Sequence, residues 1–383
     1  MWIHEQNNWP KFSWDSNKLY SKLADVRYRQ GRLLGNMGTL GVALKQEANL
    51  NTLTYDVVMT SAIEGETLNP DAVRSSLARR LGIHSEHNVP VSRDVEGIVE
   101  VMLDATTHIN KPLTKNRLFD WHAALFPTGR SGMRRITVGG WRDIAAGAMQ
   151  VISGAIGQEK IHFEAPSADR LDKEMEMLLT WINENDDLDP VIKAGIAHVW
   201  FVTIHPFEDG NGRIGRAIVD MLLARADGIG ERFYSMSTQI EAERKEYYHQ
   251  LEMQQRNSTD ITAWLAWFLD CLGRAISNAE RTLGEVMFKA GVWQKLRAHP
   301  VNERQRMILN KMLEKDFEGY INTSKYAKLA KCSTDTALRD IQELIKWKVL
   351  IQNKSGGRST SYRIDETRSD NTSNTQQTLS IHN

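Results

Sequence analysis

Apolar residues recur at intervals of three and four positions along most of the chain, which is the spacing of one buried face of a helix. This pattern predicts a mainly α-helical protein. The expected helices cover residues 15–46, 50–63, 70–81, 92–108, 114–125, 168–183, 191–204, 214–226, 237–256 and 261–289. Before them, residues 1–14 contain four aromatic residues and a proline, and we expect a short extended arm that packs its rings on the body.

Helical spacing fails between residues 126 and 168, where seven glycines interrupt the chain. Two short apolar runs remain, 151–153 and 160–163, with a glycine-containing turn between them. This arrangement predicts a β-hairpin, closed by Pro166. On the residues alone, an ordinary surface hairpin explains it equally well.

The chain changes again from about residue 302. The pattern predicts helices at 303–315, 324–329 and 334–346, a strand or cap at 321–323, and strands at 349–351 and 361–364 around two glycines. Helix–turn–helix followed by a hairpin resembles a winged helix. Residues 320–363 hold nine basic and three acidic side chains, which suits duplex DNA, whereas dimerisation and target binding are equally open uses. Residues 366–383 are polar, and we expect them to be disordered.

Composition sets further bounds. A chain of 383 residues accommodates two or three domains, and its 48 basic and 48 acidic residues balance, so overall charge indicates neither nucleic-acid nor membrane binding. The two cysteines, Cys271 and Cys332, predict no disulfide framework and no structural zinc site. No signal-like N-terminus is present, and no apolar run approaches the roughly 18 residues that span a bilayer. We therefore expect a cytoplasmic protein with no membrane partner.

Chemically useful residues are concentrated between two predicted helices, in the turn His-Pro-Phe-Glu-Asp-Gly-Asn-Gly-Arg-Ile-Gly-Arg at 205–216. Gly210 and Gly212 lack Cβ atoms, so backbone N–H groups there can approach a ligand closely. A helix that starts near Arg213 would direct unpaired N–H groups and its dipole at an anion. Arg213 and Arg216 share one face of that helix, as a bidentate phosphate site requires.

Two further side chains complete a phosphate-transfer site. Asp209 is an oxygen ligand that can hold Mg²⁺ between phosphates, and His205 is the candidate general base because its ordinary pKa lies near neutral. The order of residues excludes a Walker A loop. The alternative is a glycine-rich surface turn with a solvated histidine, which a lone histidine would favour but this density of functional groups does not.

The whole stretch His205–Arg216 resembles the motif of the Fic family at every fixed position. That resemblance implies a helical core that moves AMP from Mg·ATP to a protein hydroxyl. His205 would be the base and Asp209 the Mg²⁺ ligand. Gly210, Asn211 and Gly212 would bind the α- and β-phosphates, and Arg213 and Arg216 the outer phosphates.

A second resemblance concerns the end of the helix at 50–63. Glu64 followed by Gly65 is a helix terminus, and an acid there is slightly unfavourable unless a cation meets it. Thr60-x-x-x-Glu64-Gly65 resembles the Fic inhibitory motif, which implies that Glu64 pairs with Arg216 and prevents productive seating of the γ-phosphate. A solvated glutamate at a helix end is the alternative.

The family also places a flap hairpin before its motif, where it clamps the target by strand addition. The flap here would comprise Val151, Ile152, Ser153 and Gly154. The expected organisation is an N-terminal extension with the inhibitory helix (1–90), a Fic catalytic core (91–290), a winged-helix-like domain (300–365) and a disordered tail (366–383).

The leading hypothesis is thus an autoinhibited protein adenylyltransferase that uses ATP and Mg²⁺ and modifies Ser, Thr or Tyr of a target protein or of itself. Removal of AMP at the same site is a variant in which Glu64 orients a water. Some Fic proteins use other nucleotides or phosphocholine. Two alternatives are not enzymes. One is a nucleotide-sensing regulator that binds DNA, and the other is an antitoxin-like scaffold whose Fic site is silent. The sequence leaves open a homodimer, the target and the means of releasing Glu64.

Overall fold

Two compact units make up the chain, residues 1–280 and residues 281–383. The computed structural model describes every residue except 84–88, 145–146, 154–159, 185–186, 314–316, 318, 354–359 and 366–383. The predicted disordered tail and Gly154 of the predicted flap therefore lie outside the described residues. No described helix is long and apolar enough to cross a membrane.

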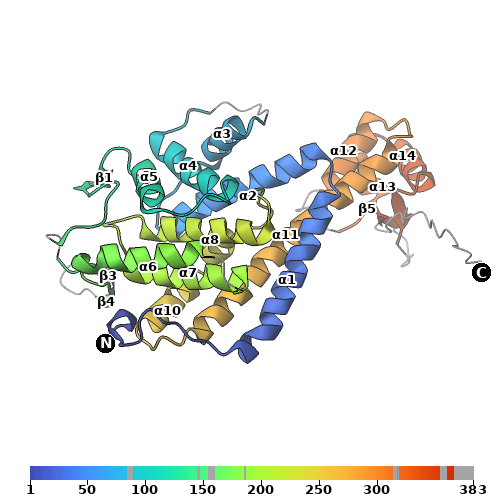
Figure 1. The fold of residues 1–383 in the computed structure, drawn as a ribbon. Helices are drawn as coiled ribbons and strands as arrows, with labels where there is room; N and C mark the ends of the chain where they lie inside the picture. The colour runs from blue at the N-terminus through green and yellow to red at the C-terminus, as the bar shows by residue number, and fades with distance from the viewer. Residues whose placement is uncertain are drawn as a thin grey trace, which may run out of the picture. The chain divides into compact units, whose positions relative to one another are not determined.

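The first unit is mainly helical, as predicted (Figure 1). Its helices are α1 (Ser16–Gly38), α2 (Val42–Ile63), α3 (Pro70–Leu81), α4 (Arg93–Thr107), α5 (Lys115–Leu125), α6 (Leu171–Asn183), α7 (Pro190–Ile204), α8 (Asn211–Asp227), α9 (Met236–Ala242), α10 (Arg244–Gln255) and α11 (Thr262–Leu296), which continues past the unit boundary. Short 3-10 turns are η1 (Ile3–Glu5) and η3 (Ala168–Arg170), and the strands are β1 (Arg130–Ser131), β2 (Arg134–Arg135), β3 (Gln150–Ser153) and β4 (Lys160–Glu164).

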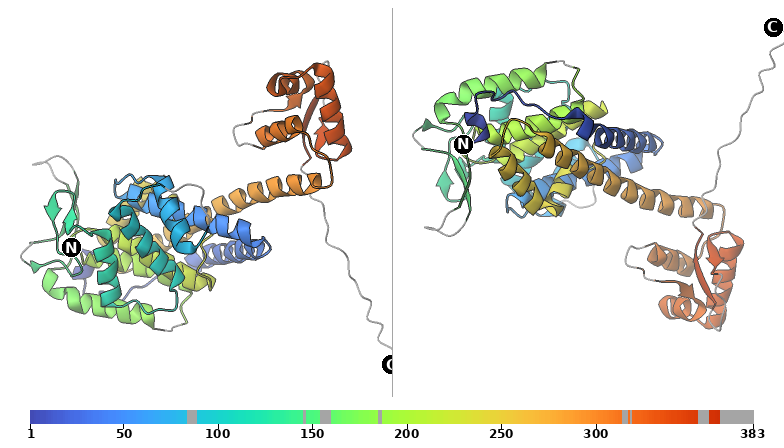
Figure 2. Two further views of the ribbon diagram at one scale, coloured as in Figure 1. Left: turned by 90° about the horizontal axis from the view of Figure 1, so that it is seen from above. Right: turned by 90° about the horizontal axis from the view of Figure 1, so that it is seen from below.

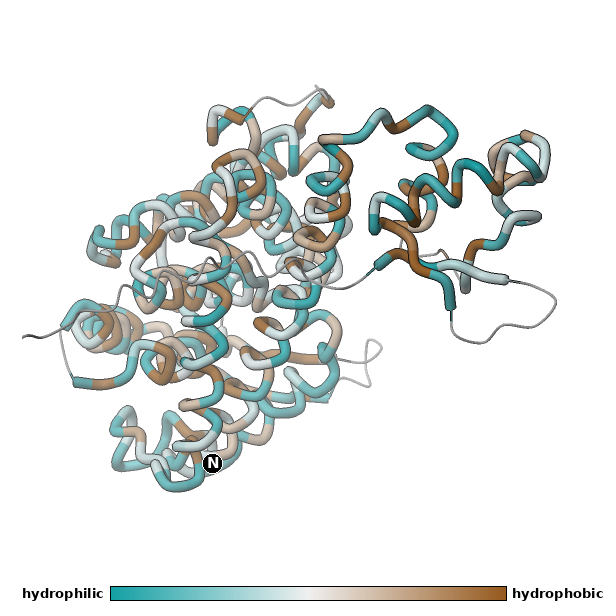
Figure 3. The backbone as a smooth tube through the Cα atoms, turned by 90° about the vertical axis from the view of Figure 1, so that its right-hand side faces the viewer, coloured by the Kyte–Doolittle hydropathy of each residue, from teal (hydrophilic) through white to brown (hydrophobic). Residues whose placement is uncertain are grey.

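Helices α7 and α8 form the centre of this unit (Figure 1). Every residue of α7 from Val191 to Ile204 is buried, as its apolar sequence predicts. Gly195 lets α11 approach closely, since a Cβ there would lie 2.9 Å from Leu265 Cδ2. Trp264 of α11 donates its indole N–H to the Gly195 carbonyl over 2.8 Å, so the close approach also satisfies a buried donor. Along the other helices of this unit, hydrophobic and hydrophilic residues alternate within single turns, as the colours in Figure 3 show.

Several predicted boundaries were wrong. The expected helices 15–46 and 50–63 divide instead at residues 39–41, because α1 ends at Gly38 and Gly41 is the extended N-cap of α2. The expected helix 237–256 is two helices that meet at Glu243. Helix α11 continues to Leu296, and α8 begins at Asn211, three residues earlier than the expected range.

The N-terminal arm packs against the hairpin, so its expected contact with the body is confirmed. Trp2 meets Phe163 of β4 edge to face at 5.3 Å, and the His4 ring bonds the Glu164 carbonyl over 2.8 Å. Ile3 is completely buried. Both views of Figure 2 place the N-terminus beside the strands β3 and β4.

The predicted hairpin is present and consists of β3 and β4, which pair antiparallel. Val151 lies opposite Phe163 and Ile152 opposite Ile161, with a bulge between the two pairs. The Val151 and Ile152 side chains are 37% and 53% exposed, so β3 presents apolar side chains to solvent.

The second unit has its own core. Its elements are α12 (Glu303–Met312), β5 (Ile321–Asn322), α13 (Thr323–Ala330), α14 (Thr334–Lys346), β6 (Leu350–Gln352) and β7 (Ser361–Ile364). The sheet order is β5-β7-β6, all antiparallel. Buried apolar residues of α12, α14 and β6, among them Ile308, Ile341 and Leu350, form one cluster. Each predicted element of this region is therefore present, within one to three residues of its expected bounds.

Gly97 offers a test of the helix packing in the first unit. A Cβ at this position of α4 would overlap the backbone carbonyl oxygen of Ala124 in α5. We expect Gly97→Ala to lower the free energy of unfolding by about 1–3 kcal/mol through overpacking, despite the better helix propensity of alanine. Urea titration followed by circular dichroism measures the change.

Gly31 in α1 is the matched control, because a Cβ added there would meet no neighbouring atom within 4 Å beyond its own stretch of helix. Gly31→Ala should raise stability by up to about 1 kcal/mol. Equal effects of the two substitutions would contradict the packing of α4 against α5.

Candidate active site

The turn between α7 and α8 is fixed by two left-handed residues and one amide. His205 ends α7 with φ 52°, which is uncommon for a residue other than glycine, and Gly210 precedes α8 with φ 80°. Asn211 is buried, and its amide accepts from the Phe207 N–H over 2.9 Å and donates to the Phe207 carbonyl over 2.8 Å. The side chain predicted to bind phosphate is thus committed to the turn, which leaves the backbone N–H of Asn211 for a ligand.

The tautomer of His205 follows from its one ring contact. Nδ1 lies 3.2 Å from the Val202 carbonyl, which can only accept, so Nδ1 carries the proton. In the neutral ring Nε2 then holds the lone pair that a general base needs. Burial lowers the pKa of His205, and the Arg142 charge lowers it further, against the opposing carboxylates of Glu64 and Asp209. The ring is therefore neutral at pH 7.

The first turn of α8 has free backbone N–H groups and holds a carboxylate. The N–H groups of residues 211–213 precede the first intrahelical bond, which runs from Ile214 N to Gly210 O. A Cβ at Gly212 would overlap Glu64 Oε1. The Glu64 carboxylate therefore lies against the helix N-terminus, in the place that such a terminus offers to an anionic ligand.

Arg216 holds that carboxylate and the helix that carries it. Its Nη2 lies 2.8 Å from Glu64 Oε1, so the predicted ion pair is present. Its Nε donates to Thr60 Oγ1 over 2.7 Å and Nη2 donates to the Thr60 carbonyl over 2.8 Å. Burial alone would lower the pKa of Arg216, but Glu64 raises it above its ordinary value. The Arg216 guanidinium is 2% exposed and always charged. Its burial therefore depends on the Glu64 carboxylate, which is the counter-ion beside it.

A second ion pair of the same kind was not predicted. Arg213 Nη1 lies 2.7 Å from Glu66 Oε2, and the ring of Phe126 lies 5.1 Å from the guanidinium carbon. Burial raises the pKa of Glu66, although the Arg213 charge opposes this shift. Both motif arginines are thus paired with acids from one segment. The available signal was the spacing Glu-Gly-Glu at the helix end, opposite two arginines one turn apart.

Asp209 lies at the exposed side of the turn. Its Oδ1 accepts from the Gly210 N–H over 2.6 Å, Oδ2 accepts from the Ser131 hydroxyl, and the side chain is 42% exposed. Among the described residues no three His, Cys, Asp or Glu side chains gather around a common point. One accessible carboxylate fits Mg²⁺ held mainly by substrate phosphates and water, and does not fit an all-protein cage.

His122 packs against this turn and hydrogen-bonds to it. Its ring stacks on Phe207 at 4.2 Å, Nε2 donates to the Asp209 carbonyl over 3.2 Å, and Nδ1 accepts from the Gly139 N–H. Burial lowers the pKa of His122 to about 4, so the ring stays neutral. This histidine therefore has a structural role, in packing and hydrogen bonding.

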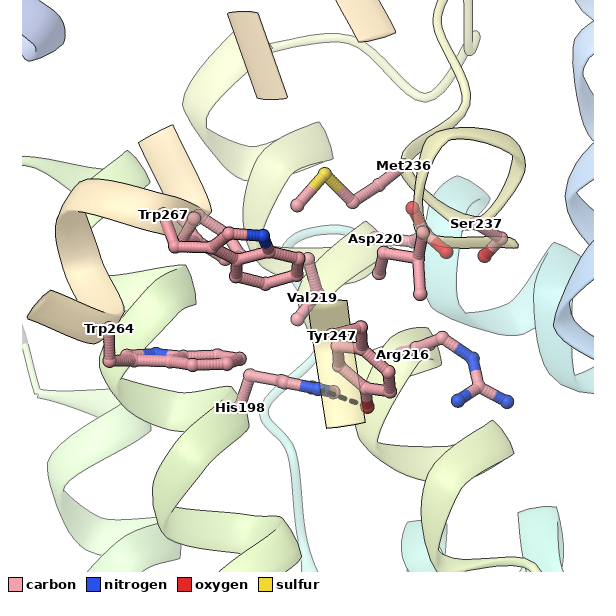
Figure 4. A pocket seen from close by; sticks show the side chains of 11 residues that line it. His198, Arg216, Val219, Asp220, Met236, Ser237, Tyr247, Trp264 and Trp267 are labelled. Carbon is pink, nitrogen blue, oxygen red and sulfur yellow. Dashed lines mark hydrogen bonds between the residues drawn. The ribbon is translucent and has the colours of Figure 1, made fainter. Parts of the chain in front are cut away.

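A small cavity lies beneath Arg216 (Figure 4). His198 lies flat against Trp264 and bonds the Tyr247 hydroxyl over 2.9 Å. Tyr247 is buried and packs in the core. Tyr248 is partly exposed and donates its hydroxyl to the Ile63 carbonyl over 3.2 Å, so it also contacts the end of α2.

The side chain of Arg142 joins the hairpin to the turn. Arg142 donates Nε to the His205 carbonyl over 2.9 Å and Nη2 to the carbonyl of Pro166, which follows β4. The predicted flap residues Val151, Ile152 and Ser153 lie on β3 of this hairpin. Their contact with a target stays a prediction.

Comparisons with known proteins agree with this geometry. Residues 112–223 match the family model described as Fic/DOC family, and residues 2–83 match a domain of unknown function, DUF4172. Protein adenylyltransferase fic-1 of Caenorhabditis elegans is 27% identical over 176 residues, which cover 44% of this chain and 31% of that protein. Protein adenylyltransferase Fic of Drosophila willistoni is 26% identical over 243 residues, covering 61% and 42% respectively. The chain thus spans less than half the length of these curated relatives.

Solved structures share the fold. A Fic family protein from Desulfovibrio desulfuricans G20 aligns with a TM-score of 0.51 at 20% identity, over 92% of this chain and 97% of that one. A Fic domain containing signaling protein from Bacteroides thetaiotaomicron aligns with a TM-score of 0.51 at 20% identity, over 68% and 96%. The complete motif on the turn from α7 to α8 lies within residues 112–223, so the chain contains a Fic/DOC family domain in this range.

Proposed function

We propose that this protein transfers AMP from ATP to a hydroxyl group of a protein. The observation that carries the proposal is the placement of Glu64 Oε1 over Gly212 and against Arg216. A carboxylate held there by a helix N-terminus and a guanidinium occupies a site suited to a phosphate. The names of the relatives, which are protein adenylyltransferases, favour ATP as the nucleotide.

The transfer is a displacement at the α-phosphorus. The acceptor oxygen forms a bond to this phosphorus, the bond to the oxygen that bridges to the β-phosphate breaks, and pyrophosphate leaves. The acceptor proton passes to Nε2 of His205, which the Val202 contact leaves free. Arg213, Arg216 and the N–H groups at the start of α8 would stabilise charge on the outer phosphates and orient them.

Asp209 is the residue that would hold Mg²⁺. When bound, the ion would neutralise charge on the phosphates, as it does in phosphoryl transfer generally. Ser131 positions the Asp209 carboxylate, and His122 fixes the backbone of the same residue.

Glu64 would act as a brake because it competes for Arg216. A γ-phosphate that binds in the place of the carboxylate must displace it from Arg216. Removal of AMP would be a separate hydrolysis at the same residues. A water that Glu64 orients would attack the phosphorus, the bond to the protein oxygen would break, and AMP and the protein hydroxyl would be released.

The brake and the base are tested together with α-labelled ATP, by following label on the protein and on cell extract. We expect Glu64→Gly to raise AMP transfer on the order of tenfold, which corresponds to about 1.4 kcal/mol, because Arg216 is then free to bind a phosphate. His205→Ala in that variant should reduce transfer by about 10²–10⁴-fold.

ATP binding by calorimetry serves as the control, because His205→Ala should leave it within about twofold. Full transfer without His205 would contradict its role as the base. Equal transfer with and without Glu64 would contradict the brake.

Glu66 is expected to add to the brake through Arg213. In the Glu64→Gly variant, Glu66→Gln should tighten ATP binding by about 2–5-fold, which is the range for a half-exposed ion pair of up to about 1 kcal/mol. Glu66 is 49% exposed and Arg213 7%. Calorimetry measures the affinity.

Glu47→Gln is the matched substitution, because Glu47 lies on α2 and pairs with Arg74 at 2.7 Å. It should leave ATP affinity unchanged. Weaker binding in the Glu66→Gln variant would instead show that Glu66 helps to hold the nucleotide.

The second unit supports a second candidate function, binding of duplex DNA. Helix α13, helix α14 and the sheet β5-β7-β6 follow the order of a winged helix, and α14 exposes Arg339, Gln342 and Lys346. An exposed helix of this kind suits a major groove.

Fluorescence anisotropy with a labelled mixed-sequence duplex and the full chain tests this function. We expect binding at 50 mM salt that weakens at least tenfold at 200 mM, through counterion release. The double variant Arg339→Ala, Lys346→Ala should weaken it further, whereas Lys45→Ala, in the first unit, should not. Absence of binding at low salt would contradict DNA binding and favour contacts with proteins as the role of the second unit.

A further inference from the structure

Arg142 is a buried cation outside the motif. It lies before β3, its side chain is 4% exposed, and no carboxylate pairs with it among the described residues. Burial lowers the pKa of Arg142 to about 10, and no other cause contributes. A buried charge without a counter-ion is costly to stability, so its contacts call for an explanation.

All of its described hydrogen bonds reach the site or the base of the hairpin. Nε donates to the His205 carbonyl over 2.9 Å, and Nη2 donates to the Pro166 carbonyl. The Arg142 backbone N–H donates to the Pro206 carbonyl over 2.9 Å. One residue therefore holds both peptide groups that follow the ring of the candidate base.

The His205 carbonyl belongs to a strained residue. A left-handed conformation at a non-glycine residue costs on the order of 1 kcal/mol or more and persists only where its surroundings fix it. The guanidinium is a rigid donor that fixes the orientation of this peptide group. The direction of the imidazole depends on that orientation, because the backbone at Cα sets the direction of the Cα–Cβ bond that carries the ring.

The same side chain reaches the hairpin. Pro166 follows Ala165, whose N–H donates to the Met149 carbonyl over 2.9 Å and closes the base of β3 and β4. One guanidinium thus bridges the peptide group of His205 and the base of the hairpin that would hold an acceptor.

We propose that Arg142 is a positioning residue for the transfer reaction: it fixes the peptide of His205 and ties it to the base of the hairpin. The inference rests on the proposed AMP transfer. Lysine at this position would keep the charge but could not donate to both carbonyls in the fork geometry of arginine.

The charge of Arg142 also affects the pKa of His205. The groups that act on the His205 ring are Arg142 before β3, Glu64 at the end of α2 and Asp209 in the turn. Loss of the Arg142 charge removes a repulsion of the protonated ring, so the pKa of His205 rises. A larger fraction of the base is then protonated at low pH, and activity falls first on the acid side.

The test compares Arg142→Lys and Arg142→Met, both in the Glu64→Gly variant, by kcat, KM for ATP and the pH profile. For Arg142→Lys we expect kcat to fall about tenfold. KM for ATP should stay within about twofold, and the acid limb of the pH profile should not move. For Arg142→Met we expect a fall of about 100-fold in kcat, with the acid limb moved up by about one pH unit.

Arg225→Lys is the matched control. Arg225 also donates only to backbone carbonyls and a sulfur among its described partners, over 2.6 Å to Ile109 and 2.9 Å to Lys111, and burial lowers its pKa as well. It lies at the far end of α8, so its replacement should change stability but neither kcat nor the pH profile.

A titration of His205 by NMR, identified with a His205→Asn variant, gives a readout that needs no transfer. We expect its pKa to be higher in Arg142→Met than in the parent. An unchanged kcat in Arg142→Lys, or an unchanged titration in Arg142→Met, overturns the proposal. If Arg142→Met does not fold, the split between kcat and KM in Arg142→Lys decides. If the parent transfers no AMP, the proposed function fails, and the proposal for Arg142 fails with it.

Discussion

The ion pair of Glu64 with Arg216 is the contact on which the rest of the site depends. It places a carboxylate over Gly212, against the unpaired N–H groups of α8, where the absence of a Cβ leaves room for it. The same guanidinium binds Thr60 through two further hydrogen bonds. One buried cation therefore joins the last turn of α2 to the first turn of α8. An arginine so deeply buried would be costly without this carboxylate, so the site requires an anion whether it comes from the chain or from a nucleotide.

This constraint gives the N-terminal region a physical role. Residues 2–83 match a domain of unknown function, yet they contribute α2, the acids Glu64 and Glu66 that follow it, and the arm that packs Trp2 on Phe163. The region thus contacts the motif turn and the start of α8 at one end and the hairpin at the other. A change that withdraws α2 frees both arginines, while Arg142 keeps the base and the hairpin in register.

The sequence was most informative where a signal is local. Helices with a capped start and strong spacing, such as α3 and α14, were predicted at their observed bounds, and the motif turn required no tertiary information. The break at residues 39–41 was missed because Gly38 and Gly41 follow Gly31 and Gly35, which the helix tolerates. Glu66 and Arg142 were missed for another reason. Their partners lie 147 and 63 residues away in sequence, and a charge carries no local sign of the partner it will meet.

The most direct measurement is a crystal structure of the Glu64→Gly variant with ATP and Mg²⁺. The account predicts that phosphate oxygens lie over Gly212 and contact Arg216, in the place that the Glu64 carboxylate now occupies, with the α-phosphorus within reach of His205. A nucleotide bound elsewhere, or one whose phosphates avoid the first turn of α8, would contradict the claim that Glu64 stands in for a phosphate.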